Sequence, residues 1–168
     1  GRWISYTWKE YYEYVRKTAV GLEKIGLKKD AKLAIISDNI PEVLVVAIAA
    51  QAVGGISAGI YQSSLPDEIA DILNYMDVSM VFCGDQEQVD KFLDIIDELP
   101  ELKKIVFWDP KGMRAYLEDP RIVYFYDVVN IGKQYEEKNP GFFEESVEKG
   151  KGTDIATICY TSGTTGLP

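Results

Sequence analysis

The sequence predicts an α/β protein, in which helices cover both faces of a layered, mainly parallel sheet. Short apolar runs typical of buried strands alternate with segments that have helical periodicity. From residue 32 to residue 108, a single helical segment separates each strand from the next, which predicts right-handed crossovers and parallel strands. Of the 168 residues, 46% are hydrophobic, which is enough for one globular core.

The first expected element is a helix from about residue 8 to residue 25. Thr7 and Glu10 have the spacing of a capping box, and Gly26 suits the left-handed residue that ends a helix. Seven apolar residues recur at helical spacing and form one face: Trp8, Tyr11, Tyr12, Val15, Ala19, Leu22 and Ile25. We expect this aromatic stripe to belong to the core.

A strand and a second helix are expected next. Residues 32–36 are typical of a buried strand. Pro41 begins a helix whose residues 43–53 are apolar on nearly all sides, so we expect it to be buried between layers. An extended segment is expected over residues 56–61.

The same alternation continues along the chain. Ser64 and Asp67 are expected to cap a third helix, whose inward residues are Ile69, Ile72, Leu73 and Met76. A strand is expected over residues 80–83. The helix after it carries the inward residues Val89, Phe92, Leu93, Ile96 and Leu99.

The second half of the chain is expected to add strands, helices and an exposed connector. Strands are expected over residues 105–108 and 122–125, and helices over residues 127–138 and 142–149. Residues 150–152 are expected to form an exposed connector. A last buried strand is expected over residues 154–160.

Composition excludes several classes of function. The net charge of −9 and the pI near 4.6 disfavour nucleic acid as a partner. Histidine is absent, which removes Ser-His catalytic pairs and most zinc sites from these residues. The longest apolar run, residues 43–50, is shorter than the roughly 20 residues that a bilayer-spanning helix needs. Cys83 and Cys159 lie in apolar runs, so we expect buried, reduced thiols and a reducing compartment.

The segment that directly follows the last expected strand has the composition of a phosphate-binding loop. Residues 161–166 hold four hydroxyl side chains and two glycines. Glycines let backbone N–H groups approach an anion closely, and hydroxyls add hydrogen-bond donors. Such a loop would lie at the carboxyl ends of the strands, where open α/β sheets bind ligands. Gly163 and Gly166 are too close for a Walker A motif, and the alternative is an ordinary polar turn.

Residues 160–168, Tyr-Thr-Ser-Gly-Thr-Thr-Gly-Leu-Pro, resemble the phosphate loop of the adenylate-forming (AMP-binding) family. This family includes acyl-CoA synthetases, luciferases and peptide-synthetase adenylation domains. Residues 1–26 resemble the opening of long-chain fatty acyl-CoA synthetases. Residues 38–42 are similar to their Asn-x-Pro-Glu turn, and residues 51–64 resemble a second motif, in which Gln62 replaces a frequent proline. The resemblance implies that residues 1–168 are a partial N-terminal AMP-binding domain, truncated at both ends and lacking the C-terminal domain.

The resemblance also implies a two-step reaction. A fatty acid carboxylate attacks the α-phosphorus of ATP to give an acyl-adenylate and pyrophosphate, and the thiol of coenzyme A then displaces AMP. The expected cofactors and co-substrates are ATP, Mg²⁺ and coenzyme A. The residues implied to hold the ATP phosphates are Thr161, Ser162, Gly163, Thr164, Thr165 and Gly166. Thr161 is also implied as an indirect contact of Mg²⁺. No catalytic residue is expected within the fragment, which should be inactive alone.

The expected partners are small molecules, namely a fatty acid, ATP and coenzyme A. A cytoplasmic location is expected, and the resemblance is compatible with peripheral attachment to a membrane and with a homodimer of the parent enzyme. Three alternatives stay open. The first is another adenylate-forming ligase, of the peptide-synthetase or luciferase type. The second is a non-catalytic flavodoxin-like domain with an FMN phosphate loop. The third is a truncated domain with a structural or partner-binding role, whose uncovered sheet edge and apolar faces would make it self-associate.

Overall fold

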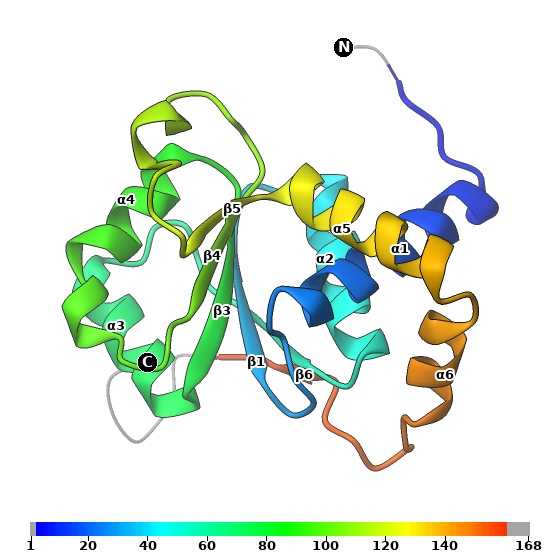
Figure 1. Ribbon diagram of the computed structural model, residues 1–168. Coiled ribbons are helices and arrows are strands. Elements are labelled where there is room, and N and C mark those ends of the chain that lie inside the picture. Colours follow the sequence, from blue (N-terminus) through cyan, green and yellow to red (C-terminus); the bar gives the residue numbers. More distant parts are fainter. Residues whose placement is uncertain (1–2, 161–168) are drawn as a thin grey trace.

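A parallel sheet between two layers of helices forms the molecule in the computed structural model, which describes residues 3–160 (Figure 1). Within these residues the strand order is β5-β4-β3-β1-β2-β6, and every pairing is parallel. The strands are β1 (Lys32–Ile36), β2 (Ile56–Gly59), β3 (Val78–Cys83), β4 (Lys104–Phe107), β5 (Ile122–Tyr124) and β6 (Thr157–Ile158). The predicted fold class is therefore confirmed.

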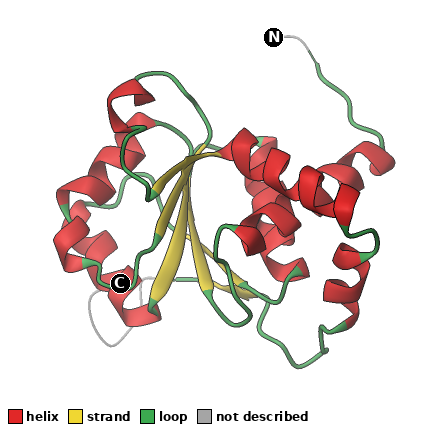
Figure 2. Cartoon of the chain, viewed as in Figure 1, coloured by secondary structure: helices red, strands yellow, loops and turns green. Residues whose placement is uncertain are grey.

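Helices lie on both faces of the sheet (Figure 2). One face is covered by α1 (Trp8–Lys24), α2 (Pro41–Ala52), α5 (Phe125–Lys138) and α6 (Phe142–Glu148). The other face is covered by α3 (Pro66–Met76) and α4 (Gln86–Asp94). Two 3₁₀ turns, Ile96–Glu98 and Met113–Tyr116, complete the described elements. No described helix has both the length and the apolar character needed to cross a membrane.

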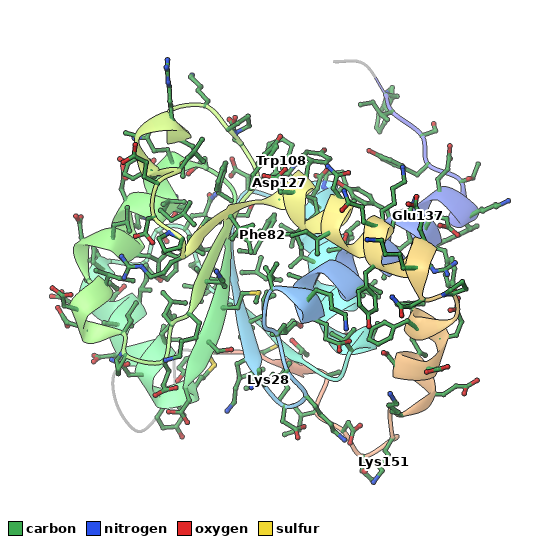
Figure 3. All side chains as sticks on the ribbon, in the orientation of Figure 1. Lys28, Phe82, Trp108, Asp127, Glu137 and Lys151 are labelled. Atoms are coloured by element: carbon green, nitrogen blue, oxygen red, sulfur yellow. The ribbon has the colours of Figure 1, made fainter. Side chains whose placement is uncertain are left out.

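The core has two parts, one on each side of the sheet. Alternate residues of a strand point to opposite faces, so β3 contributes to both parts. Val81 and Cys83 face α3 and α4, whereas Phe82 faces α5 (Figure 3). The Phe82 ring packs edge-on against Phe125 of α5, with 5.5 Å between ring centroids. Cys83 is fully buried, as predicted.

Helix α1 begins and ends as its sequence predicts. The Glu10 N–H donates to the Thr7 hydroxyl at 3.2 Å, and the Thr7 N–H donates to the Glu10 carboxylate at 2.7 Å. Gly26 has φ +121°, the left-handed conformation expected after the helix. The prediction that this aromatic stripe belongs to the core is wrong for Trp8 and Tyr12, which are 88% and 44% exposed. The buried part of α1 starts only at Val15, so its first turns extend beyond the core.

Helices α1 and α5 approach each other through glycines. A Cβ atom at Gly132 would lie 1.9 Å from the carbonyl oxygen of Lys17, and one at Gly21 would lie 2.0 Å from that of Val128. Only glycine permits such a close backbone contact. Nearby, the Arg16 Nε donates to the buried carboxylate of Glu136 at 2.7 Å. The crossing therefore combines close backbone packing with one ion pair.

Helix α2 is buried on one side only, which corrects the prediction that it lies between layers. Val46 and Ala49 are fully buried against the sheet, whereas Leu44 and Ile48 on the opposite side are exposed. The uniform apolar composition of the helix gave no sign of which side faces outward. Among the described elements, none covers this outer side.

The start of α3 and the end of α4 also differ from prediction. Leu65, not Ser64, is the N-cap residue of α3, and its N–H donates to the Glu68 carboxylate at 2.9 Å. The predicted inward face of α3 is confirmed. Helix α4 ends at Asp94. Ile95, between the helix and the 3₁₀ turn, is buried, whereas Ile96 in the turn is only partly buried.

The prediction of a buried strand over residues 154–160 is wrong. The strand β6 has only two residues, and Ile155 just before it is 62% exposed. Cys159 is exposed as well, so its predicted burial is also wrong. The reason is topological, because β6 pairs only with β2 and forms an edge of the described sheet.

Candidate functional site

The six residues predicted to hold phosphates, Thr161, Ser162, Gly163, Thr164, Thr165 and Gly166, lie outside the described residues. The structure describes how the chain leads to them through β6 and Tyr160. Since all six strands are parallel, their carboxyl ends lie along one edge of the sheet. Tyr160 follows the carboxyl end of β6, and this edge is where α/β sheets bind their ligands. The candidate site is therefore the end of β6 together with the residues that hold it.

One side of β6 is held by a chain of polar side chains. The Gln51 Nε2 of α2 donates to the Ser57 hydroxyl of β2 at 3.1 Å, and that hydroxyl donates to the Thr157 hydroxyl at 3.3 Å. The Thr157 hydroxyl in turn donates to the Ser57 carbonyl at 2.9 Å. Ser57 is only 4% exposed, so a buried hydroxyl links β2 to β6.

The other side of β6 is held by apolar contacts. Ile158 and Tyr160 pack against the core between the sheet and α3. The Tyr160 ring lies edge-on to Tyr75 of α3, with 6.5 Å between ring centroids. Burial raises the pKa of Tyr160 above its ordinary value, and the neighbouring Tyr75 adds to this effect. Tyr160 therefore stays a neutral side chain at neutral pH.

A crevice also exists at the reversal of strand order, between β1 and β3. The helices that follow these strands, α2 and α4, lie on opposite faces of the sheet, which opens a crevice at the carboxyl edge. Its volume is about 110 Å³. The lining residues are Ser37, Asp38, Ile40, Gly84, Asp85, Trp108 and Asp109. Three carboxylates and no lysine or arginine thus line this crevice in the described part of the chain.

This crevice argues against the flavodoxin-like alternative. The strand order of β1 to β5 is 2-1-3-4-5, which is the order of flavodoxin-like proteins, and those bind FMN at the β1/β3 reversal. Carboxylates would repel the FMN phosphate. Pockets for drug-sized ligands typically have roughly 300–1,000 Å³, several times the volume found here. The described residues therefore share a strand order with flavodoxin, but the small acidic crevice at their strand reversal does not favour an FMN phosphate.

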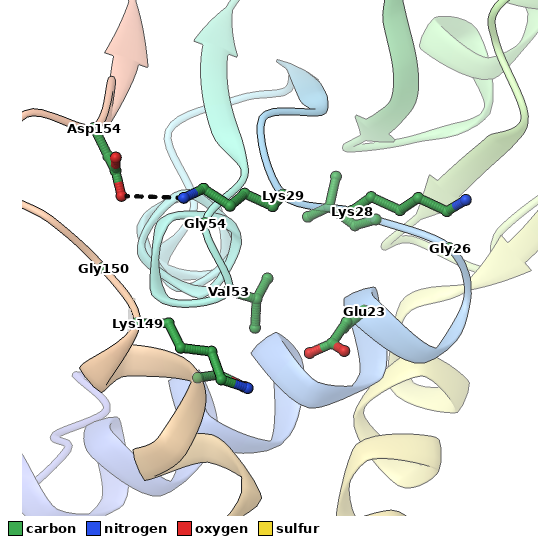
Figure 4. Close-up of a pocket in the computed structure, with 11 residues that line it drawn as sticks. Glu23, Gly26, Lys28, Lys29, Val53, Gly54, Lys149, Gly150 and Asp154 are labelled. Atoms are coloured by element: carbon green, nitrogen blue, oxygen red, sulfur yellow. Dashed lines mark ion pairs between the residues drawn. The ribbon is translucent and has the colours of Figure 1, made fainter.

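A larger cavity of about 410 Å³ lies at the opposite, amino end of the strands (Figure 4). It is bounded by the C-terminal ends of α1, α2 and α6 and by the connector that leads to β6. The Lys29 ammonium lies 3.9 Å from the carboxylate of Asp154, which also accepts a hydrogen bond from the Lys151 N–H. These contacts attach the connector to the loop before β1. The cavity is thus on the far edge of the sheet from Tyr160.

Sequence reasoning missed the residues that hold β6. Gln51 and Ser57 lie within the second motif, residues 51–64, but neither they nor Thr157 and Tyr75 were predicted to hold this strand. The signal in the sequence is weak, namely a single hydroxyl residue in each of two apolar strand segments, Ser57 in one and Thr157 in the other. Their contact depends on the pairing of β2 with β6, which brings together residues 100 positions apart.

Comparison with known proteins gives a consistent result. The family model described as "AMP-binding enzyme" matches residues 1–168. The chain is 30% identical to long-chain-fatty-acid–CoA ligase ACSBG1 of Bos taurus, over 100% of the chain and 22% of that protein. It is 26% identical to ACSBG2 of Xenopus laevis, over 99% of the chain and 22% of that protein. The chain thus spans about a fifth of the length of these curated relatives.

Solved structures share the fold. The anthranilate CoA ligase AuaEII, in complex with anthranoyl-AMP, matches with a TM-score of 0.76 and 19% identity, over 95% of this chain and 28% of that one. A putative long-chain-fatty-acid CoA ligase from Rhodopseudomonas palustris CGA009 matches with a TM-score of 0.63 and 19% identity, over 95% of this chain and 33% of that one.

Proposed function

Because the chain belongs to the AMP-binding enzyme family, we propose that it is the N-terminal part of a long-chain fatty acid–CoA ligase. The parent enzyme joins a fatty acid to ATP to form an acyl-adenylate and pyrophosphate, and then transfers the acyl group to coenzyme A. The observation that carries the proposal is the hydroxyl- and glycine-rich segment 161–166, which follows β6 at the ligand-binding edge of a parallel sheet.

In this proposal, residues 161–166 hold the β- and γ-phosphates of ATP while the carboxylate attacks the α-phosphorus. Their backbone N–H groups and hydroxyls are uncharged donors that suit phosphate oxygens. The donor set also fits a magnesium ion held mainly by the phosphates, since Mg²⁺ usually keeps waters and binds few protein ligands. Bound there, Mg²⁺ would neutralise phosphate charge, with Thr161 as its indirect contact. Among the described residues, no group of three or more acidic or cysteine side chains, the three aspartates of the crevice included, is arranged so that it could hold a metal ion.

The preference for a long-chain fatty acid is supported by the curated relatives, which are long-chain-fatty-acid–CoA ligases. The alternative within the family is a ligase that activates another carboxylate, such as an amino acid. Membership of the family favours either of these over a flavodoxin-like domain, and the acidic crevice at the β1/β3 reversal supports the same conclusion. We place the parent enzyme in the cytoplasm, which suits the free thiols of Cys83 and Cys159.

The test is carboxylate-dependent exchange of pyrophosphate into ATP, measured on the full-length protein with a panel of carboxylates. Exchange is expected with long-chain fatty acids and Mg²⁺, followed by thioester formation when coenzyme A is added. Removing one hydroxyl with Thr164→Val is expected to lower exchange by about a hundredfold, in the range found when a preorganised donor to a transition-state oxygen is lost. Thr153→Val is the matched control, because Thr153 is exposed and has no side-chain hydrogen bond among the described residues. Exchange with amino acids only would replace the fatty-acid proposal, and no exchange with any carboxylate would overturn it.

A further inference from the structure

We propose that Gln51, Ser57 and Thr157 are positioning residues for the ATP-binding segment. Their hydrogen bonds set the register of β6 on β2, and this register sets the position of Tyr160, from which the chain continues into the segment. The inference rests on the proposed function, because it assigns the role of holding ATP to that segment. It concerns three residues that would not contact the nucleotide themselves.

The first step of the argument is that β6 has little backbone pairing of its own. Only two residue pairs join it to β2, Ser57 with Thr157 and Ala58 with Ile158. No second strand flanks β6 in the described part of the sheet. A strand this short has few ladder hydrogen bonds to define its register, so its side chains must contribute.

The second step is that the side chains of β6 match different surroundings on its two faces. Thr157 points to the α2 side, where Ser57 and Gln51 offer hydrogen bonds. Ile158 and Tyr160 point to the α3 side and pack against apolar residues. A shift by one residue would exchange these faces. Ile158 would then meet the polar pair of Ser57 and Gln51.

The third step is that the hydroxyls of Ser57 and Thr157 each have an acceptor to which they donate a hydrogen bond. Ser57 accepts from Gln51 and donates to Thr157, and Thr157 donates to the Ser57 carbonyl. If Thr157 loses its hydroxyl, the buried Ser57 hydroxyl still accepts from Gln51, but its remaining acceptor is the Ala156 carbonyl at 3.5 Å, a longer and weaker hydrogen bond. The correct register is therefore favoured over shifted ones. The ring contact of Tyr160 with Tyr75 of α3 holds the two residues after β6, Cys159 and Tyr160, in the same register.

The consequence is a link between α2 and the ATP-binding segment. Thr157 stands four residues before Thr161, and an error in register moves Tyr160, the last described residue before the segment, along the sheet edge. Misplaced N–H and hydroxyl donors would bind the ATP phosphates more weakly, so the effect should appear in the KM for ATP. The reaction should therefore depend on Thr157 even though this residue is remote from the phosphates in the sequence motif.

The experiment compares Thr157→Val with Thr157→Ser in the full-length protein. Valine keeps the shape of threonine and is favourable in strands, so the fold should persist while the hydroxyl is lost. We expect the KM for ATP in pyrophosphate exchange to rise about tenfold, with the KM for the fatty acid unchanged. Thr157→Ser restores the hydroxyl and should restore the KM for ATP. Thr153→Val serves again as the control and should match the wild type.

A merely structural role of Thr157 gives a different pattern. In that case Thr157→Val would lower the melting temperature and the fraction of active enzyme. The apparent kcat would fall, and the KM for ATP would be unchanged. Ser57→Ala is the second variant, which breaks the same chain from β2 and is expected to raise the KM for ATP in the same way. An unchanged KM for ATP in both variants, within about twofold given the scatter of single-interaction effects, overturns the inference.

Hydrogen exchange of the backbone amides separates this inference from the proposed function. The Ser57 N–H donates to the Ala156 carbonyl at 3.2 Å, so loss of register should speed its exchange in Thr157→Val. This measurement requires no activity. If the wild type catalyses no pyrophosphate exchange, the proposed function fails, and unchanged amide exchange in the variant would then also refute the role of Thr157 in register. Faster amide exchange without a change in the KM for ATP would show that the register of β6 does not affect ATP binding by the segment.

Discussion

Single residues decide where elements begin in this chain, and the capping box of α1 is the clearest case. Hydrogen bonds from the Thr7 N–H and hydroxyl lower the pKa of Glu10 below its ordinary value. The interaction involves residues three positions apart, so it depends on local sequence alone. By contrast, Cys83 is buried because it lies in β3, inside the sheet, and Cys159 is exposed because it follows β6 at the edge of the described sheet. The similar apolar runs around the two cysteines gave no distinction.

Replacing Thr7 by alanine is expected to lower the free energy of unfolding by about 1 kcal/mol at neutral pH, as for other threonine caps. The sign of the pH dependence follows from the lowered pKa of Glu10. The stabilising contribution of the ionised Glu10 carboxylate is present at pH values above the ordinary pKa of a glutamate. It is lost as the pH falls through the lower pKa of Glu10 in the folded state.

The difference between wild type and Thr7→Ala should therefore be largest near about pH 7 and should shrink near about pH 3. Urea unfolding at a series of pH values measures it. Alanine keeps the N–H of residue 7, which donates to the Glu10 carboxylate, so the comparison reports on the bond from the Thr7 hydroxyl to that carboxylate. A difference that stayed constant over this range would show that this hydroxyl bond does not contribute to stability.

At the scale of elements, the crossing of α1 and α5 is decided by two glycines that lie far apart in the sequence. Gly21 and Gly132 let the backbones meet so closely that a Cβ atom at either position would collide with a carbonyl oxygen. A glycine inside a helical pattern is otherwise unfavourable, so its presence is a weak signal of close packing. Which helix it faces follows only from the tertiary structure.

Gly132→Ala tests the close contact of α1 with α5, because its two effects on the free energy of unfolding have opposite signs. Alanine is favoured over glycine within a helix by about 1 kcal/mol, whereas overpacking of a tight contact costs about 1–3 kcal/mol. The added Cβ atom would lie 1.9 Å from the Lys17 carbonyl oxygen, so we expect a net loss of stability in thermal and urea unfolding.

Asn130→Ala on the exposed side of the same helix is the control, and it should be neutral or slightly stabilising. If Gly132→Ala raised the stability as the control does, the two helices would not be in close contact there.

At the scale of the whole molecule, the described surface combines a strongly acidic charge with uncovered apolar residues. Leu44 and Ile48 form an exposed pair on α2, and Ile155 is exposed next to β6 at the sheet edge. Exposed apolar side chains together with an open sheet edge favour association. The net charge of −9 opposes it by repulsion, and added salt weakens this repulsion.

We therefore expect the 168-residue chain to associate with itself, and to do so more strongly as salt is added. Substituting both Leu44 and Ile48 by glutamine should shift the molecular mass toward that of a monomer without changing the net charge. Multi-angle light scattering over a range of salt concentrations measures this shift. Leu117→Gln removes an exposed leucine elsewhere and is the control. Equal association of the double variant and the control would rule out α2 as the associating surface.

Local sequence determined much of this protein. The alternation of strands and helices, the cap of α1, the left-handed Gly26 and the inward face of α3 all depend on residues within a few positions of each other. The family was visible from motifs along the chain, and its match to residues 1–168 agrees with them. The role of residues 161–166 stays a prediction, because these residues lie outside the described part.

Tertiary structure alone decided which apolar surfaces are covered and what holds β6. Apolar composition marked α2 and residues 154–160 as buried, but burial depends on whether another layer or strand lies beside them. The hydrogen bonds from Gln51 through Ser57 to Thr157 could not be foreseen, because they require the pairing of two strands 100 residues apart. Local interactions determine where helices and strands form. Which residues surround each helix or strand depends on the order of the strands and on the position of the layers, and both of these are non-local.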